Sequence, residues 1–242
     1  MNIFRSIANW VFIVLVPVFL LSGTIAWAFN SLWIYTNGFE KYAVGQELNI
    51  SPSQLDKSAA ELITYFNNPS EKYLDISVTY DNGVTAPLFL DEQTTQVDLA
   101  DVRHMEDVKS VVWLDYWLFV VSALYSAGYF TAMLIGKRNQ KRQDLASGLK
   151  RGGIATMGLI CFLGVFAVTS FDWFFTTFHE IFFPQGNWQF PMGDHMITLF
   201  PDGFWSDVTL LVGLAALVLA VIVWVAGFMW LGRIKAKNIM PE

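Results

Sequence analysis

Four stretches of the chain are almost continuously apolar, and the segments between them are polar. They cover residues 10–29, 113–135, 153–175 and 208–231. Each is long enough to cross the hydrocarbon core of a bilayer as a helix, which needs about 20 residues. The acids inside them, Asp115 and Asp172, lie within a turn of an end. The pattern therefore predicts an α-helical membrane protein with four transmembrane helices.

The basic residues indicate on which side of the membrane each polar segment lies. Residues 136–152 hold six Lys and Arg against one acid, whereas residues 176–207 hold none. The longer segment 30–112 carries five basic residues against thirteen acids. Because short cytoplasmic loops are enriched in Lys and Arg, we expect both termini in the cytoplasm and both acidic segments outside the cell.

The expected organisation follows from these boundaries. The N-terminus imitates a cleavable signal, with Arg5, an apolar run and Ala26-Trp27-Ala28. The run is longer than that of a signal peptide, so we interpret it as an uncleaved anchor. We expect a cytoplasmic end and first helix at 1–29, an extracytoplasmic segment at 30–112, a second helix at 113–135, a basic cytoplasmic loop at 136–152, a third helix at 153–175, an aromatic outer segment at 176–207, a fourth helix at 208–231 and a cytoplasmic tail at 232–242.

The composition bears on possible partners and on disulfide bonds. The net charge of −6 resides mostly in the outer segments, which argues against nucleic acid as a partner. The single cysteine, Cys161, lies in the middle of the third apolar stretch, so no disulfide within the chain is expected.

The segment 30–112 is too long to be a bare connection. Ser51-Pro52-Ser53-Gln54 is typical of a helix start, and apolar residues recur at helical spacing from Leu55 to Phe66, before Asn67-Asn68-Pro69 ends the run. Asp81-Asn82-Gly83, between two strand-like runs at 77–80 and 84–90, indicates a hairpin. A last helix, from about Thr94 to Lys109, either ends there or joins the second transmembrane helix. The segment thus predicts a small α+β cap.

The second outer segment is rich in aromatic residues. Residues 171–205 contain nine Phe and three Trp, together with several Pro and Gly that exclude one continuous helix. So many Phe side chains would form a large apolar patch in water, so we expect this segment at the membrane interface, where it could hold acyl chains. The alternative is an aromatic belt that only anchors the bundle.

All three histidines, His104, His179 and His195, fall in the two segments expected outside the cell. Histidine is the side chain suited to proton transfer near neutral pH, so the clustering suggests proton chemistry at that surface. Asp101 and Asp107 are three residues from His104 on either side and share its helical face. A carboxylate there can orient a general base, although a solvated helix face with ordinary charge pairing would have the same pattern.

His179 has possible partners of its own. Asp172 and Thr176 lie on the same helical face, which allows a second carboxylate–histidine pairing. His179-Glu180 is not a zinc-protease signature, because position 183 is Phe where a second His is required. We expect no metal, and a site of unusual spacing built from the three histidines and carboxylates is the alternative. The chain has no Gly-x-Ser-x-Gly motif, so a serine hydrolase has no support.

Several motifs together resemble a known family. His104-Met105-x-Asp107-Val108 precedes Phe178-His179-Glu180-Ile181-Phe182-Phe183, which leads to Asn187-Trp188 and then to Leu199-Phe200-Pro201 and Phe204-Trp205. In this order, over nearly the whole chain, they resemble a family of bacterial four-span membrane proteins whose characterised member is the lipoprotein intramolecular transacylase.

The resemblance implies a reaction and a location. The substrate would be a diacylated bacterial lipoprotein, with a diacylglyceryl group on its N-terminal cysteine. The acyl chain at the middle glycerol position would move to the cysteine α-amine, giving a lyso-form N-acylated lipoprotein. No cofactor is implied, since donor and acceptor belong to one molecule. The expected partners are lipoproteins and membrane lipid, at the outer face of the bacterial plasma membrane.

The resemblance also implies roles for particular residues. His104 and His179 are the expected catalytic pair, with Asp107 as the orienter of His104. Asn187 is a candidate donor to the oxyanion or to the head group, or a structural turn residue. The expected substrate-binding residues are Asn187, Trp188, Phe182, Phe183 and, outside the motifs, His195.

Two other functions are compatible with the sequence. A lipid or lipoprotein hydrolase or transferase could use the same histidines with water or another acceptor, and a hydrolase would release free fatty acid. A membrane sensor or assembly factor would need neither histidine and would act through the surface of the cap.

Overall fold

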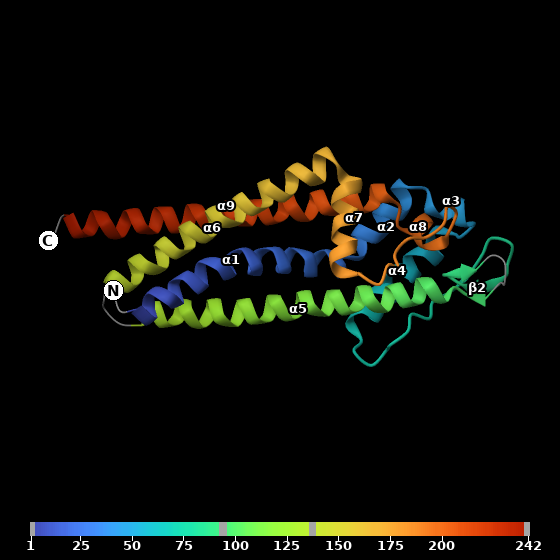
Figure 1. Ribbon diagram of the computed structural model, residues 1–242, viewed down its shortest axis with the longest axis horizontal. Helices are drawn as coiled ribbons and strands as arrows, with labels where there is room; N and C mark the ends of the chain where they lie inside the picture. Colours follow the sequence, from blue (N-terminus) through green and yellow to red (C-terminus); the bar gives the residue numbers. More distant parts are fainter. Residues whose placement is uncertain (1–2, 92–95, 136–138, 240–242) are drawn as a thin grey trace. The chain divides into compact units, whose positions relative to one another are not determined.

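The computed structural model describes residues 3–91, 96–135 and 139–239, which are mostly helical (Figure 1). In chain order the elements are α1 (Ile3–Phe29), α2 (Leu32–Lys41), α3 (Val44–Leu48), α4 (Pro52–Asn67), β1 (Ser77–Thr79), β2 (Thr85–Pro87), β3 (Leu90–Asp91), β4 (Gln96–Val97), α5 (Leu99–Leu134), α6 (Asn139–Thr169), α7 (Phe171–Phe182), α8 (His195–Leu199) and α9 (Asp202–Ile239).

Two compact units make up the chain. Unit 1 consists of Met1–Ile25, Asp115–Val165 and Leu210–Glu242, and unit 2 of Ala26–Leu114 and Phe166–Thr209. The helices α1, α5, α6 and α9 are long and apolar enough to cross a membrane. The predicted four apolar helices are therefore present.

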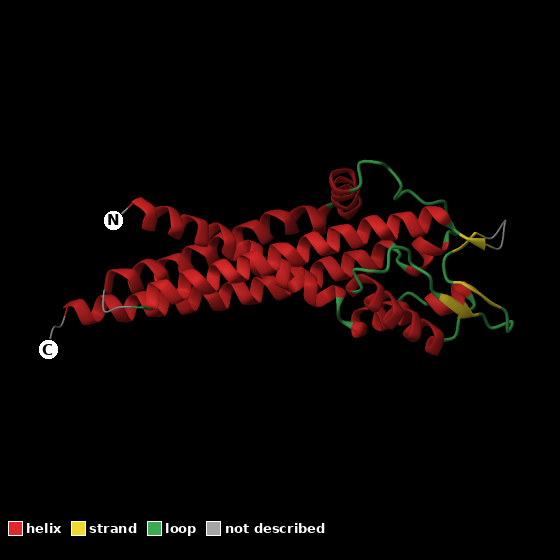
Figure 2. Cartoon of the chain, turned by 90° about the horizontal axis from the view of Figure 1, so that it is seen from below, coloured by secondary structure: helices red, strands yellow, loops and turns green. Residues whose placement is uncertain are grey.

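Unit 1 is a bundle of parts of these four long helices, which run side by side in Figures 1 and 2. Two adjacent glycines of α6 let its backbone approach its neighbours closely. A Cβ on Gly152 would lie 2.7 Å from Cβ of Val16, and one on Gly153 would lie 2.8 Å from the carbonyl oxygen of Ala220. The buried apolar core of unit 1 contains Phe12, Val16, Leu20, Tyr129, Met133, Leu145 and Ala220.

The C-terminal end of the third transmembrane stretch was predicted too far along the chain. The apolar pattern continues to residue 175, but α6 ends at Thr169, and Ser170 leaves the helical conformation with φ −156° and ψ 74°. The helix α7 begins at Phe171 as a separate element. The basic segment 136–152 is not a simple loop either, since α6 begins at Asn139, while Lys137 and Arg138 lie outside the described residues.

The predicted α+β cap, residues 30–112, lies in unit 2, which also contains Phe166–Thr209, and Figure 2 shows the strands of the cap. The predicted hairpin is confirmed, because β1 and β2 pair antiparallel with Val78 opposite Ala86. Its turn contains Gly83 with φ +83°, a conformation that L side chains rarely adopt. A second antiparallel pair joins β3 and β4, which the sequence did not predict.

The helices of unit 2 agree with the prediction in part. Helix α4 begins after Ser51 with Pro52 in its first turn, as expected, but the Ser51 side chain makes no capping hydrogen bond. Its apolar face is buried, with Leu62 and Ala59 fully enclosed. The last helix of the segment does join the second transmembrane helix, as α5, although Thr94 lies outside the described residues. The short helices α2 and α3 were not predicted.

Candidate functional site

His104 and His179 meet within unit 2. His104 comes from the N-terminal part of α5 and His179 from the last turn of α7. Their ring centroids are 6.0 Å apart with the planes inclined by 27°, and the two residues are only 6% and 8% exposed. About 75 residues separate them in sequence, so the predicted proximity of the two motif histidines is confirmed.

A backbone carbonyl fixes the tautomer of His179. Its Nδ1 lies 2.8 Å from the carbonyl oxygen of Phe175, one turn earlier in α7. A carbonyl oxygen only accepts hydrogen bonds, so Nδ1 must carry the proton, and in the neutral ring Nε2 is left with a lone pair. Burial lowers the pKa of His179 below its ordinary value of 6.5, although the bond to Phe175 acts in the other direction. The ring is therefore held ready to accept a proton at Nε2.

The carboxylate pairing that the sequence allowed for His179 is not seen among the described residues. Asp172 lies exposed in the first turn of α7, and the carbonyl oxygen of Phe175 accepts the hydrogen bond from Nδ1 of His179. The helical spacing of Asp172, Thr176 and His179 was correct, but a backbone acceptor one turn away needs no particular residue type and leaves no signal in the sequence.

His104 presents an unsatisfied nitrogen. Its Nδ1 is buried and has no hydrogen-bond partner among the described residues. Leaving a buried polar atom unpaired costs free energy, and such atoms in native proteins usually point to a function or to a bound partner. A polar group of a bound molecule would satisfy this nitrogen.

Aromatic side chains enclose the histidine pair. Phe183 is 2% exposed and contacts both rings, with centroids 5.0 Å from His104 and 5.4 Å from His179. The ring centroid of Trp188 lies 4.8 Å from that of His179, and the ring centroid of Phe190 lies 5.6 Å from that of His104. Such walls exclude water and strengthen electrostatic interactions between the groups inside.

Of the two adjacent Phe residues predicted to bind substrate, only Phe183 lines the pair. Phe182 is 41% exposed, and its described ring contact is with Phe178, 4.8 Å away. It therefore contributes to an outward apolar surface of α7 and not to the enclosure of the two histidines.

Asp107 holds the segment that follows α7. Its Oδ2 accepts hydrogen bonds from Nε2 of Gln185 at 2.8 Å and from Nδ2 of Asn187 at 2.6 Å. No hydrogen bond joins it to His104 among the described residues, so the expected orienting bond is not seen. What Asp107 does instead is fasten a stretch about 80 residues away to α5.

This arrangement also fixes the amide of Asn187. Because Asp107 can only accept, the nitrogen of the amide must face it, which leaves the oxygen on the other side. That oxygen, Oδ1, is buried without a hydrogen-bond partner in the described part of the chain. The free atom of Asn187 is thus an acceptor, which suits an N–H of a bound molecule better than an oxyanion.

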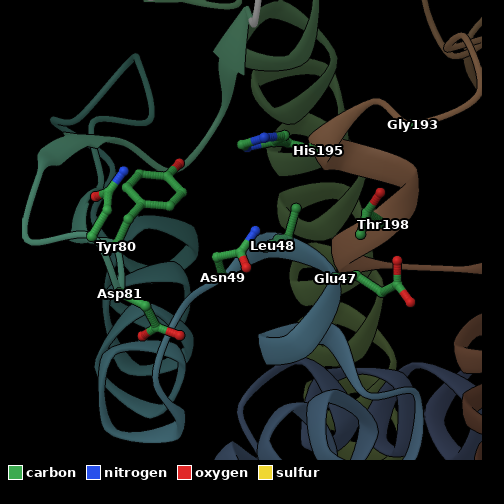
Figure 3. A pocket seen from close by; sticks show the side chains of 9 residues that line it. Glu47, Leu48, Asn49, Tyr80, Asp81, Gly193, His195 and Thr198 are labelled. Atoms are coloured by element: carbon green, nitrogen blue, oxygen red, sulfur yellow. The ribbon is translucent and has the colours of Figure 1, made fainter.

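His195 lies in a different place. Its Nδ1 is 2.7 Å from the carbonyl oxygen of Leu88, and its ring faces Tyr80 at 6.4 Å. It lines a cavity of about 510 Å³ between the β1–β2 hairpin, α3 and α8, which Figure 3 shows from close by. The structure therefore brings two of the three histidines together and places the third at a cavity that neither His104 nor His179 lines.

The histidines do not build a metal site. Within the described ranges, the one group of His, Cys, Asp and Glu close enough to hold an ion consists of Asp98, Asp101 and Asp194. Asp101, expected to share a face with His104, thus faces two other acids. The site at His104 and His179 has instead the parts for proton transfer: a base with a fixed tautomer, a second buried imidazole and an apolar enclosure.

Comparisons with known proteins agree with this fold. The profile of the family described as lipoprotein intramolecular transacylase Lit matches residues 10–205. An uncharacterized protein of Aquifex aeolicus (strain VF5) is 29% identical over 141 residues, which are 57% of this chain and 59% of that protein. The matched part thus spans less than two thirds of the length of that relative.

Solved structures are similar over almost the whole chain. The in meso structure of the membrane integral lipoprotein intramolecular transacylase Lit from Bacillus cereus covers 99% of this chain and 100% of that one, with a TM-score of 0.77 and 16% identity. A histidine variant of that protein covers 97% of this chain and 96% of its own, with a TM-score of 0.67 and 15% identity. The predicted family resemblance and fold class are confirmed, and the chain is a multi-pass membrane protein.

Proposed function

Because the chain belongs to the lipoprotein intramolecular transacylase family, we propose that it is an acyltransferase that acts on lipoproteins within the membrane. In this proposal the substrate is a lipoprotein whose N-terminal cysteine carries a diacylglyceryl group. The acyl chain of the middle glycerol position moves to the α-amine of the same cysteine. The product is a lyso-form N-acylated lipoprotein.

The observation that carries the proposal is the buried pair of His104 and His179, 6.0 Å apart in an aromatic enclosure. The α-amine of a peptide has a pKa of about 7.7–8.0 and is mostly protonated at neutral pH, so it must lose a proton before it can attack an ester. Nε2 of His179, which carries the lone pair of the neutral ring, is the proposed acceptor of that proton.

The proposed reaction conserves all atoms of the substrate. The amine nitrogen attacks the ester carbonyl carbon, and a tetrahedral intermediate forms. The C–N bond of an amide is made as the C–O bond of the ester breaks, and the glycerol oxygen leaves with a proton. His104, beside His179, is placed to position that oxygen or to pass the proton to it. Neither water nor a cofactor takes part, because donor and acceptor belong to one molecule.

The remaining residues of the site have supporting roles in this proposal. Amine and ester are in one substrate, so folding that substrate into a reactive conformation supplies much of the rate through effective molarity. Phe183 and Trp188 provide apolar walls against which an acyl chain can pack. The unpaired Oδ1 of Asn187 is available to accept from the substrate amine, and Asp107 holds that amide in place.

The proposed membrane topology follows from the charge pattern. Both termini and the basic segment 136–152 lie in the cytoplasm, whereas the segments 30–112 and 176–207, which carry the histidine pair, face outward. The substrate site is then at the extracytoplasmic face of the plasma membrane, where the acyl chains of a lipoprotein enter the bilayer.

The proposal is tested with purified protein and a synthetic diacylated lipopeptide, by following the loss of the free α-amine with an amine-reactive label. His104→Ala and His179→Ala are each expected to slow acylation by about 100-fold or more, the scale for removing a general acid or base. His195→Ala, another buried histidine of unit 2, is the control and keeps close to the wild-type rate. Normal acylation by a protein that lacks both motif histidines would overturn the proposal.

A further inference from the structure

Three carboxylates converge at the start of two helices in unit 2. Asp98 immediately precedes α5, Asp101 lies in its first turn, and Asp194 immediately precedes α8. One oxygen from each lies within 4.8 Å of an oxygen from each of the others. None of the ion pairs within the described residues involves them, and burial together with the neighbouring carboxylates raises the pKa of Asp101 to about 8.

In two of these carboxylates, one oxygen caps the N-terminus of a helix. Oδ1 of Asp98 accepts the backbone N–H of Ala100 at 2.7 Å, and Oδ1 of Asp194 accepts the backbone N–H of Met196 at 2.8 Å. These are ordinary N-terminal caps. The second oxygen of each carboxylate is not needed for capping and is available for another partner.

Helix capping does not explain why the carboxylate of Asp101 is buried. It is 1% exposed, and neither of its carboxylate oxygens accepts a hydrogen bond from any described residue. The groups nearest to it in the cluster are the carboxylates of Asp98 and Asp194, which cannot donate when ionised. A buried, ionised carboxylate without a partner costs several kcal/mol, so a compensating positive charge is required if Asp101 is ionised.

We propose that Asp98, Asp101 and Asp194 form a binding site for a calcium ion. The donors are all carboxylate oxygens, which hard cations prefer. Oxygens that lie within 4.8 Å of one another can reach one Ca²⁺, because two oxygens bound to it at 2.3–2.6 Å are at most about 4.6–5.2 Å apart. Ca²⁺ is favoured over Mg²⁺, because Mg²⁺ usually keeps several waters and is bound by only one or two carboxylates. Waters and the second oxygens of the carboxylates complete the coordination.

The ion would join two parts of unit 2 that are distant in sequence. It would connect the N-terminus of α5, one turn before His104, with the N-terminus of α8, which carries His195. The site is separate from the histidine pair, and its role is to stabilise the fold around that pair. It does not depend on the proposed reaction.

Calcium binding is tested on the full-length protein in detergent after treatment with EGTA. Titration with CaCl₂, followed by isothermal calorimetry and by the midpoint of thermal unfolding, is expected to show one Ca²⁺ per chain and a midpoint that rises with calcium concentration. The absence of both effects at about 10 mM calcium, above the weakest Kd of ordinary calcium sites, would overturn the proposal.

The variants Asp98→Asn and Asp194→Asn separate ion binding from helix capping. Asparagine caps a helix about as well as aspartate, so these proteins keep their caps and lose one charge of the site. Each is expected to bind calcium at least about tenfold more weakly, because the affinity of such sites depends on the number of charged ligands. Asp75→Asn, an exposed acid of the same unit, is the control with unchanged binding.

Asp101→Asn gives the sharpest result. It removes the buried carboxyl group that would bind the ion, so added calcium should no longer raise the midpoint of its thermal unfolding. A proton shared between Asp101 and Asp194 would instead satisfy the cluster without an ion. In that case the stability of the wild type depends on pH and not on calcium, which would contradict the proposal.

Discussion

Asp107 provides a quantitative test of how the site is assembled. Its carboxylate accepts two hydrogen bonds, at 2.8 Å from Gln185 and 2.6 Å from Asn187. Hydrogen bonds to a charged group contribute about 1.5–3 kcal/mol each, and the half-buried position of Asp107 favours the lower end. Asp107→Ala therefore removes up to about 3 kcal/mol that hold the segment after α7 on α5. Since 1.4 kcal/mol is a factor of about ten, we expect kcat/KM for amine acylation to fall by about 10–100-fold.

A double-mutant cycle shows whether this loss arises from the bond to Asn187. Asn187→Ala removes one partner, and once Asp107 is Ala there is no bond left for it to break. The rate losses of the two single variants should therefore not multiply in the double variant. The coupling free energy should exceed about 0.5 kcal/mol, the deviation from additivity that independent sites show. Glu106→Ala is the matched control, because Glu106 is the neighbouring acid of α5 and its carboxylate forms an ion pair of 3.4 Å with Lys72 instead of holding the segment after α7. Independent effects, or an unchanged rate for Asp107→Ala, would refute the reasoning.

Three further predictions concern protonation, packing and topology. Because burial lowers the pKa of His179, NMR titration of histidine-labelled protein should find this ring neutral, protonated at Nδ1, at pH 6.5; a pKa above 6.5 would contradict its burial. Phe183→Ala should lower the free energy of unfolding by about 3 kcal/mol, the usual scale for a buried Phe, whereas Phe182→Ala, at an exposed position, should have a much smaller effect. In intact cells carrying a Cys161→Ser background, an impermeant thiol reagent should label a cysteine placed at Ser53 and spare one at Gln140; labelling at Gln140 would exclude the proposed topology.

The sequence predicted those features that depend on local periodicity. The apolar stretches gave the four long helices, and the Ser51-Pro52 start and the Asp81-Asn82-Gly83 turn gave α4 and the first hairpin. The break at Ser170 was missed because apolar residues continue through it, so that the pattern of α6 runs into that of α7. A break between two helices without a change of hydrophobicity leaves no periodic signal.

The candidate site was predictable in its residue types but not in its connections. The two motif histidines were identified and do approach each other. Helical spacing allowed Asp101 or Asp107 to pair with His104 and Asp172 to pair with His179, and the family resemblance implied Asp107 as the partner of His104. In the structure Asp107 accepts hydrogen bonds from Gln185 and Asn187, and His179 donates a hydrogen bond to a backbone carbonyl oxygen. Partners that come from a loop about 80 residues away, or from the backbone, cannot be derived from spacing on one helix.

The central claim is that an acyl chain moves within one lipoprotein molecule, and intact mass tests it most directly. A purified diacylated lipopeptide is incubated with the protein, and its mass and fragment spectrum are recorded before and after. We expect an unchanged total mass, with fragments that carry the acyl chain on the cysteine nitrogen and a glycerol that has lost its middle ester. A product lighter by one acyl chain, together with free fatty acid, would show hydrolysis and contradict the account.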